Sequence, residues 1–385
     1  MIVIGGLCFY TYTLSQQINF LSEQLAVFQQ EQAAQIDALS EELATLKTET
    51  LIKLGVLEGE IGEATSRLDI LEDEISDVTA AFSPSVINAN EVYQKVKHAI
   101  VRISNGERTV GSGFILDAQA HVVTAHHVTE NLPNIYVILS DGSISPATVT
   151  GSCQLSDIAV LTLEDKPAVE PLVLADSATV RIGEPVVTIG NPFDLTETLT
   201  SGIVSQINRF VEIETDSGTR WVANLVQFDA AANFGNSGGP LLNSEGEVIG
   251  MVVARIKPDE GDGIYHAVSS NKIKRVAASL IDQGSFDYPW LGVEIANLTP
   301  QTAQDRELKT TNGVLVKNVF TDSPAEAAGI KADDIIVAID GMAVRDVADL
   351  TSYLGEHKSP DEEATLELIR DTTKMELSIE IGKRD

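Results

Sequence analysis

The spacing of apolar residues changes along this chain, and the longest regular pattern lies near its start. Residues 15–82 contain no proline, and their leucine and isoleucine residues recur at steps of three and four. The unbroken part of this series is Leu54, Leu57, Ile61, Ala64, Leu68, Leu71, Ile75 and Val78. Such spacing places one apolar stripe along a helix and predicts a coiled coil. We expect the same helix of another subunit to cover the stripe, and Ser83–Ser85 to end the helix.

An apolar run, residues 1–14, precedes the predicted coiled coil. Ile2–Leu14 carries no charge, but it is shorter than the roughly 20 residues that span a bilayer as a helix. No basic residue precedes it, as one would in a signal peptide. Two interpretations remain: the visible end of a signal anchor that begins upstream, or the apolar cap of the following helix. We favour the anchor, and therefore expect membrane attachment through the N-terminus.

A different pattern fills residues 88–284, where short β-rich runs alternate with turn residues. The predicted strands are Ile100–Ile103, Ser112–Leu116, Val122–Ala125, Ile135–Leu139, Ala147–Thr150, Ile158–Leu163, Val186–Ile189, Gly202–Ile207, Val211–Glu214, Leu225–Phe228, Val248–Val253 and Gly263–Val268. Many short strands at this spacing predict two antiparallel barrels or a sandwich. An amphipathic helix, Asn271–Gln283, should pack on the second barrel.

Composition narrows the class of protein. A chain of 385 residues is long enough for two or three domains, each with its own core. Its net charge of −31 argues against nucleic acid as a partner, because phosphate backbones are bound by stripes of Lys and Arg. Cys8 and Cys153 are the only cysteines, so a disulfide framework is not expected.

The segment Asp229–Leu241, DAAANFGNSGGPL, carries the clearest chemical signal. A serine framed by glycines suits a sharp turn that exposes one hydroxyl, and this nominates Ser237 as a nucleophile. Successive N–H groups in such a turn can form an oxyanion hole. We expect Gly235 and Ser237 to donate these groups, with Asn236 shaping the turn between them.

A serine hydroxyl needs a base, and the chain supplies one. His127 lies in the run TAHHV at the end of a predicted strand, and Asp157 lies in SDIAVL just before another. The order His, Asp, Ser is that of chymotrypsin-like proteases. His127 would take the proton of Ser237, and Asp157 would orient the imidazole. Because a strand points adjacent residues in opposite directions, His126 and His127 should not both face the site.

Five segments together resemble the HtrA (Deg) family of trypsin-like serine proteases. They are GSGFIL at Gly111–Leu116, TAHHV at Thr124–Val128, SDIAVL at Ser156–Leu161, IGNPF with TSGIVS at Ile189–Ser205, and DAAANFGNSGGPL at Asp229–Leu241. The resemblance implies a mainly β, chymotrypsin-like double β-barrel, with His127 as the base. Phe234 stands where the family commonly has proline, which leaves the resting geometry of the oxyanion turn open.

Residues 288–385 resemble a PDZ domain. Leu291-Gly292-Val293 is similar to the carboxylate-binding loop and the start of the peptide-binding strand, and the most specific run extends over Ser323–Gly341. Val347–Leu354 would be the helix beside the groove. An extended C-terminal peptide would then add a strand to the sheet while backbone N–H groups hold its carboxylate.

The resemblance also implies a cellular location, an oligomeric state and a class of substrate. The short segment between Ile103 and Gly111 is similar to that of the short-loop, membrane-anchored members, which are regulated trimers. It implies a bacterial inner-membrane anchor, a periplasmic protease domain, and unfolded or specific protein substrates in quality control or stress signalling. The alternative is a latent or inactive protease-fold scaffold that binds C-terminal peptides. No metal or cofactor is predicted, since His98, His121, His266 and His357 lack metal-ligand spacing.

Overall fold

The computed structural model describes residues 2–82, 87–191, 197–215, 218–255 and 263–384. The chain forms two compact units, Met1–Ala81 and Phe82–Asp385. Ser83–Ser85, expected to end the first helix, lie outside the described residues, as do Pro192 and Phe193 of the IGNPF run.

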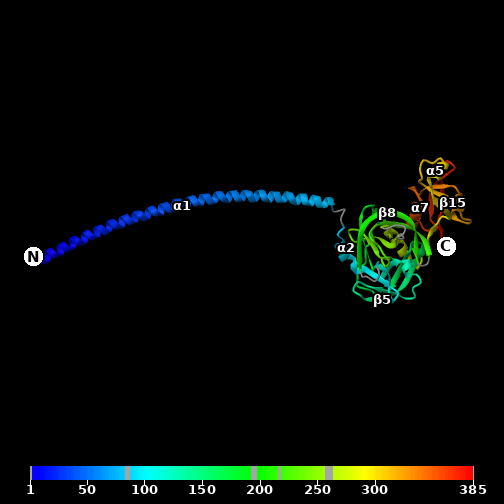
Figure 1. The fold of residues 1–385 in the computed structure, drawn as a ribbon, viewed down its shortest axis with the longest axis horizontal. Coiled ribbons are helices and arrows are strands. Elements are labelled where there is room, and N and C mark those ends of the chain that lie inside the picture. The colour runs from blue at the N-terminus through cyan, green and yellow to red at the C-terminus, as the bar shows by residue number, and fades with distance from the viewer. Residues whose placement is uncertain (1, 83–86, 192–196, 216–217, 256–262, 385) are drawn as a thin grey trace. The chain divides into compact units, whose positions relative to one another are not determined.

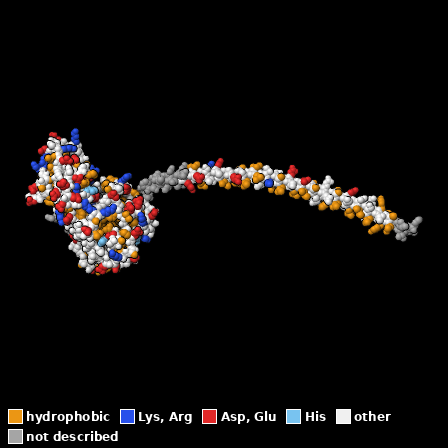
Figure 2. Space-filling view, turned by 180° about the vertical axis from the view of Figure 1, so that it is seen from behind, with side chains coloured by type: hydrophobic (Ala, Val, Ile, Leu, Met, Phe, Trp, Pro, Cys, Tyr) orange, Lys and Arg blue, Asp and Glu red, His pale blue; other side chains and the backbone are white. Residues whose placement is uncertain are grey.

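The first unit is one helix, α1 (Ile2–Phe82), drawn from blue to light blue in Figure 1. The N-terminal apolar run and the predicted coiled-coil segment therefore belong to the same helix. Apolar side chains lie along its surface (Figure 2), and Leu57 and Leu68 of the predicted stripe are 52% and 60% exposed. Such a stripe is stable in water only when a partner covers it. None of the described helices has a segment long and apolar enough to cross a bilayer.

The second unit begins with α2 (Ala89–Val96) and contains two closed barrels. Around the first barrel the order is β1 (Ile100–Ser104), β2 (Thr109–Ile115), β3 (His121–Ala125), β6 (Ile158–Leu163), β5 (Ile144–Cys153) and β4 (Ile135–Ile138). Around the second it is β10 (Pro240–Leu242), β11 (Val248–Arg255), β12 (Tyr265–Ser269), β9 (Gly218–Phe228), β8 (Thr198–Thr215) and β7 (Pro185–Gly190). The predicted double barrel is confirmed, and the sandwich is wrong.

The second barrel differs from the prediction in its longest hairpin. Two separate runs were expected within Thr198–Thr215, but β8 is one strand that pairs with β9 through three shifts of register. Bulges of this kind bend a strand and strengthen its twist. Asn208 and Arg209, between the two predicted runs, lie within the bulged part of β8, where the alternation of apolar and polar positions is interrupted.

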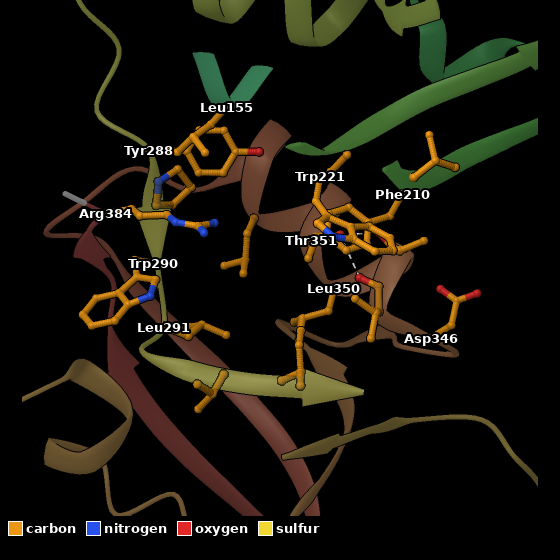
Figure 3. Close-up of a pocket in the computed structure, with 18 of the residues that line it drawn as sticks. Leu155, Phe210, Trp221, Tyr288, Trp290, Leu291, Asp346, Leu350, Thr351 and Arg384 are labelled. Carbon is orange, nitrogen blue, oxygen red and sulfur yellow. Dashed lines mark hydrogen bonds between the residues drawn. The ribbon is translucent and has the colours of Figure 1, made fainter. Parts of the chain in front are cut away.

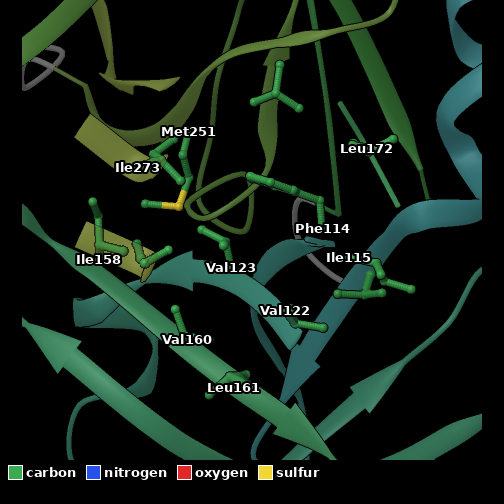
Figure 4. Close-up of a cluster of buried hydrophobic side chains, with 14 of the residues drawn as sticks. Phe114, Ile115, Val122, Val123, Ile158, Val160, Leu161, Leu172, Met251 and Ile273 are labelled. Atoms are coloured by element: carbon green, nitrogen blue, oxygen red, sulfur yellow. The ribbon is translucent and has the colours of Figure 1, made fainter. Parts of the chain in front are cut away.

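Apolar side chains fill the barrels and the space under α4 (Ser270–Gln283). Phe114, Val123 and Ile158 are fully buried, and Met251 and Ile273 join them from the second half of the chain (Figure 4). Helix α4 was expected to pack on the second barrel, and it packs there on β11 and β12. It also packs on β5 and β6 of the first barrel, because Val276 and Leu280 continue the same buried cluster.

The C-terminal part has its own sheet and core. Its strands follow the order β14 (Val293–Asn297), β15 (Val314–Val319), β16 (Ile335–Ile339), β18 (Glu363–Arg370) and β19 (Thr373–Glu380), with β17 (Met342–Ala343) paired to β16. A short ribbon joins β13 (Pro289–Trp290) to β20 (Gly382–Lys383), and the helices are α5 (Pro300–Asp305), α6 (Pro324–Ala327) and α7 (Val347–His357). The predicted helix beside the groove is α7, which extends three residues beyond Leu354.

Candidate active site and peptide groove

The structure brings His127 and Asp157 together. The imidazole Nδ1 of His127 lies 2.7 Å from Asp157 Oδ2, and the His127 backbone N–H donates to Asp157 Oδ1 at 3.0 Å. Asp157 is fully buried, and its φ of +51° places it in the left-handed region at the end of a short 3₁₀ turn. The two bonds fix both oxygens of the carboxylate, so the imidazole orientation is set by a rigid group.

The expectation that His126 and His127 extend a strand is wrong. They begin the one-turn helix α3 (His126–Thr129), directly after β3. This turn forms because the His126 N–H donates to the backbone oxygen of Asp157 at 3.1 Å while its carbonyl accepts from the Glu130 N–H. Since helical neighbours diverge by about 100° rather than 180°, both histidines lie near Asp157.

The Ser237 loop is tied to the first barrel through Ser112 of β2. The Ser112 N–H donates to the Ser237 carbonyl at 2.8 Å, and its hydroxyl donates to the Gly235 carbonyl at 2.7 Å. Ser112 is fully buried, whereas Ser237 is half-buried. A residue of one barrel thus holds the loop that carries the nucleophile candidate of the other.

Gly238 brings this loop against the strand that leads into α3. With a φ of +85°, it sits so close that an added Cβ would lie 2.1 Å from Ser112 O and 2.3 Å from Thr124 Oγ1. Such distances exclude any side chain. Ser237, the residue before Gly238, therefore lies close to the end of β3, where the turn that carries His127 begins.

The turn before Ser237 carries the predicted oxyanion donors. The Asn236 N–H donates to Asn233 O at 2.9 Å, and Gly235 at the third position has a φ of +101°, as in a type II turn. Within the described residues, the N–H groups of Gly235 and Ser237 meet no hydrogen-bond acceptor. Phe234 occupies the second position, where proline is favoured in this turn, and its side chain is 71% exposed.

A second set of charges surrounds the His127–Asp157 pair. Arg220 of β9 places Nη2 3.1 Å from Glu130 Oε2 and Nη1 4.0 Å from Asp157 Oδ1. Glu130 Oε1 in turn lies 3.9 Å from His126 Nε2. Burial lowers the pKa of His126, which favours its neutral form beside the pair.

Leu291, Gly292 and Val293 form a tight loop at the start of β14. The Leu291 carbonyl accepts from the Ala325 N–H at 2.8 Å, and the Gly292 carbonyl accepts from the Phe320 N–H at 3.0 Å. Gly292 has a φ of +84°, and a Cβ there would lie 2.2 Å from Ser323 Cβ. The loop therefore depends on glycine in the same way as the Ser237 loop.

A cavity of about 1410 Å³ opens beside this loop. Strand β14 and helix α7 line one side of it, and Leu291, Leu350 and Thr351 point into it (Figure 3). Phe210 and Trp221, from β8 and β9, line the other side, with their ring centroids 4.9 Å apart. The groove expected for a peptide thus faces the longest hairpin of the second barrel.

The end of α7 is joined to the barrels by buried polar contacts. Asn224 of β9 donates from Nδ2 to Ser352 O at 2.8 Å, and Lys272 of α4 donates from Nζ to Gly355 O at 2.9 Å. Lys272 is fully buried and lies over the Tyr288 ring, and burial lowers its pKa to about 7. A Cβ on Gly355 would lie 2.5 Å from Lys272 Nζ and 2.6 Å from Asn224 Oδ1, so a larger residue there would require both side chains to move.

Comparison with known proteins matches both parts of the second unit. Residues 111–251 match the trypsin-like peptidase domain, and residues 289–381 match the PDZ domain. The chain is 32% identical over 330 residues to the serine protease Do-like HtrA of Bacillus subtilis (strain 168), covering 81% of this chain and 73% of that protein. The chain belongs to the HtrA family of serine proteases.

Other HtrA proteins show the same relationship. The periplasmic serine endoprotease DegP of Escherichia coli (strain K12) is 36% identical over 274 residues, which cover 71% of this chain and 56% of that protein. The solved HtrA-type protease AlgW with tripeptide is 30% identical, with a TM-score of 0.66, and the match covers 77% of this chain and 98% of that structure. These matches support a mainly β serine endopeptidase with a C-terminal PDZ domain.

Sequence reasoning missed several residues around the HtrA site. Arg220 and Glu130 were not singled out, because each lies outside the family runs and meets the other only through the bulged β8–β9 hairpin. Ser112 was visible within GSGFIL, but its bonds to Gly235 and Ser237 depend on the packing of the two barrels. Among the described residues, no group of three His, Cys, Asp or Glu side chains could hold a metal ion.

Proposed function

We propose that Ser237, His127 and Asp157 are the catalytic triad of this endopeptidase. The observation that carries the proposal is the 2.7 Å bond between His127 and the buried Asp157, together with a glycine turn that leaves the Gly235 and Ser237 N–H groups without acceptors among the described residues. These are the parts that acyl transfer requires: an oriented base and donors for the oxyanion.

The reaction follows from these positions. Ser237 Oγ attacks the scissile carbonyl while His127 Nε2 takes the hydroxyl proton, and the oxygen of the tetrahedral intermediate accepts from Gly235 and Ser237. His127 then gives the proton to the leaving amine, and water hydrolyses the acyl-enzyme by the same route. Asp157 stays ionised and stabilises the imidazolium. Asn236, buried between the two donors, holds the turn in shape.

The PDZ domain is proposed to regulate this activity by binding C-terminal peptides. The Leu291–Val293 loop would hold the carboxylate, and an extended peptide would pair with β14 opposite the apolar face of α7. The solved AlgW structure with a tripeptide supports peptide binding by this fold. Because the cavity is also lined by β8 and β9, an occupant would touch the barrel that carries Ser237.

We further propose that the protein acts as a homotrimer attached to the bacterial inner membrane, with α1 as a coiled-coil stalk. The exposed apolar stripe of α1 supports a self-association role. The periplasmic location named for DegP supports an extracytoplasmic protease domain. Unfolded or specific envelope proteins are the proposed substrates, in quality control or stress signalling.

Digestion of casein by the full chain, compared with Ser237→Ala, tests the proposal. We expect cleavage by the wild type and a loss of about 10⁴-fold or more in the variant. If neither the wild type nor Ser237→Ala cleaves casein, the wild type is latent. Peptides with free apolar C-termini should then restore cleavage in the wild type alone. Continued silence with peptide would contradict the proposed activity and favour a peptide-binding scaffold.

A further inference from the structure

Arg220 is a buried, charged residue of the second barrel whose side chain extends toward Asp157 of the first barrel. Its side chain is 8% exposed, and it stands on β9, whereas Asp157 precedes β6. Burying a guanidinium is costly unless carboxylates and hydrogen bonds compensate for the lost water. Glu130 compensates with an ion pair at 3.1 Å, whereas Nη1 on the Asp157 side lies beyond hydrogen-bond distance of that carboxylate and interacts with it through charge at 4.0 Å.

Among the described residues, this cluster holds two carboxylates, Asp157 and Glu130, and one guanidinium, Arg220. The imidazoles of His126 and His127 lie beside them. Without Arg220, two carboxylates would face two imidazoles, and both rings would take up protons more readily. A base that is already protonated cannot accept the proton of a serine.

We propose that Arg220 is a positioning residue of the active site. Its positive charge, held by Glu130 and 4.0 Å from Asp157, offsets the two carboxylates so that His127 stays unprotonated near neutral pH. This inference rests on the proposed function. Glu130 is the anchor that keeps the guanidinium beside Asp157. Strand β9 also carries Asn224, which binds Ser352 of the PDZ helix α7. The same strand therefore contacts both the His127–Asp157 pair and the PDZ domain.

The pH dependence of Ser237 modification provides the test. The full-length protein would be reacted with a fluorophosphonate from pH 5 to 9, which reports the His127-assisted nucleophile without any choice of peptide substrate. For Arg220→Gln we expect the acid limb to move up by roughly half a unit to one unit, so that the rate below the limb falls about three- to tenfold. The plateau at high pH should change much less.

Two matched variants sharpen the result. Arg220→Lys keeps the charge and should restore most of the wild-type profile, although it loses the planar fork. Glu130→Gln removes the opposing charge, so its acid limb should move to lower pH. A purely structural role would instead lower the rate by the same factor at every pH, or leave the limb unmoved in both charge variants, and either result would overturn the inference.

A second measurement separates this inference from the proposed function. If the wild type does not react, with or without an apolar C-terminal peptide, the proposed activity fails. The inference is then decided by NMR titration of the chain with labelled histidines, in which the His127 signal is assigned by its loss in His127→Ala. A midpoint that rises in Arg220→Gln and falls in Glu130→Gln supports the role of Arg220, and unchanged midpoints refute it. Glu130→Gln alone gives the same decision if Arg220→Gln does not fold.

Discussion

The Ser237 loop and the Leu291–Val293 loop use the same backbone device in different surroundings. Gly238 and Gly292 have φ values of +85° and +84°, and an added Cβ would lie 2.1 Å from Ser112 O in one and 2.2 Å from Ser323 Cβ in the other. In both loops, therefore, the backbone packs so closely against its neighbours that no side chain fits at the glycine.

The groups around the two sites differ in kind. Buried ion pairs join Arg220 to Glu130 and Asp157 next to His127. Leu291, Leu350 and Leu354 form an apolar part of the groove beside the PDZ loop, although Arg209, Arg220 and Arg384 also line the wider cavity. Buried charges set the protonation of a reacting group, and an apolar groove gains affinity from burial of a ligand. The residues around a glycine turn therefore decide whether the turn supports catalysis or ligand binding.

Asp157→Asn should break the catalytic loop alone and have the largest effect. An amide is neutral, and its NH2 group can donate to His127 Nδ1 and so favour the wrong imidazole tautomer, so kcat against casein should fall by about 10⁴-fold. Asp165→Asn is the matched control, because this aspartate is exposed. Peptide binding to the PDZ groove, followed by calorimetry, should stay unchanged in both variants. A fall of less than tenfold would contradict the role of Asp157.

Gly238→Ala should abolish activity and destabilise the fold. The clash with backbone and a buried hydroxyl should cost about 3 kcal/mol or more, by analogy with other overpacked and strained sites. Gly142→Ala provides the control, because Gly142 has the same φ of +85° but no atom within 4 Å of an added Cβ. Thermal unfolding would show a large loss for the first variant and a small one for the second. Equal losses would mean that strain, rather than close approach, explains the glycine.

Gly292→Ala should break the other loop alone. We expect peptide affinity to fall about tenfold or more, because the loop must move away from Ser323. Reaction of Ser237 with a fluorophosphonate in the absence of peptide should change little. Gly341→Ala shares a positive φ but meets open space, and it should bind peptide as the wild type does. Normal binding by Gly292→Ala would exclude this loop as the carboxylate site.

Lys272→Met should have the smallest effect, and it tests the junction between the two regions. The pKa of Lys272 is lowered from 10.5 to about 7 by burial, so between these values the unfolded chain binds a proton that the folded chain does not. The free energy of unfolding of the wild type, relative to that of Lys272→Met, should therefore rise between about pH 7 and pH 10.5. The expected slope is roughly 1 kcal/mol per pH unit or less. Denaturant unfolding at several pH values would measure it, with Lys274→Met as control.

Below pH 7 the stability difference between the wild type and Lys272→Met should level off, with the methionine variant equal or more stable. A difference that does not vary with pH would show that Lys272 keeps its charge in the folded protein.

The sequence predicted the parts of this molecule that depend on local pattern. The double barrel, the PDZ domain and the meeting of His127 with Asp157 were anticipated, because strand spacing and short motifs encode them. Arg220 and Glu130 were not, since they approach each other only through the bulged β8–β9 hairpin. Lys272 gave no signal either, because a lysine on an amphipathic helix is usually exposed, and its burial depends on the close approach of Gly355.

Mapping the residue that a fluorophosphonate modifies is the most direct test of the central claim. We expect a single adduct on Ser237 in the full-length protein, formed with or without an apolar C-terminal peptide and lost in His127→Ala. An adduct on another serine, or equal labelling of Ser237 in His127→Ala, would contradict the assignment of the triad.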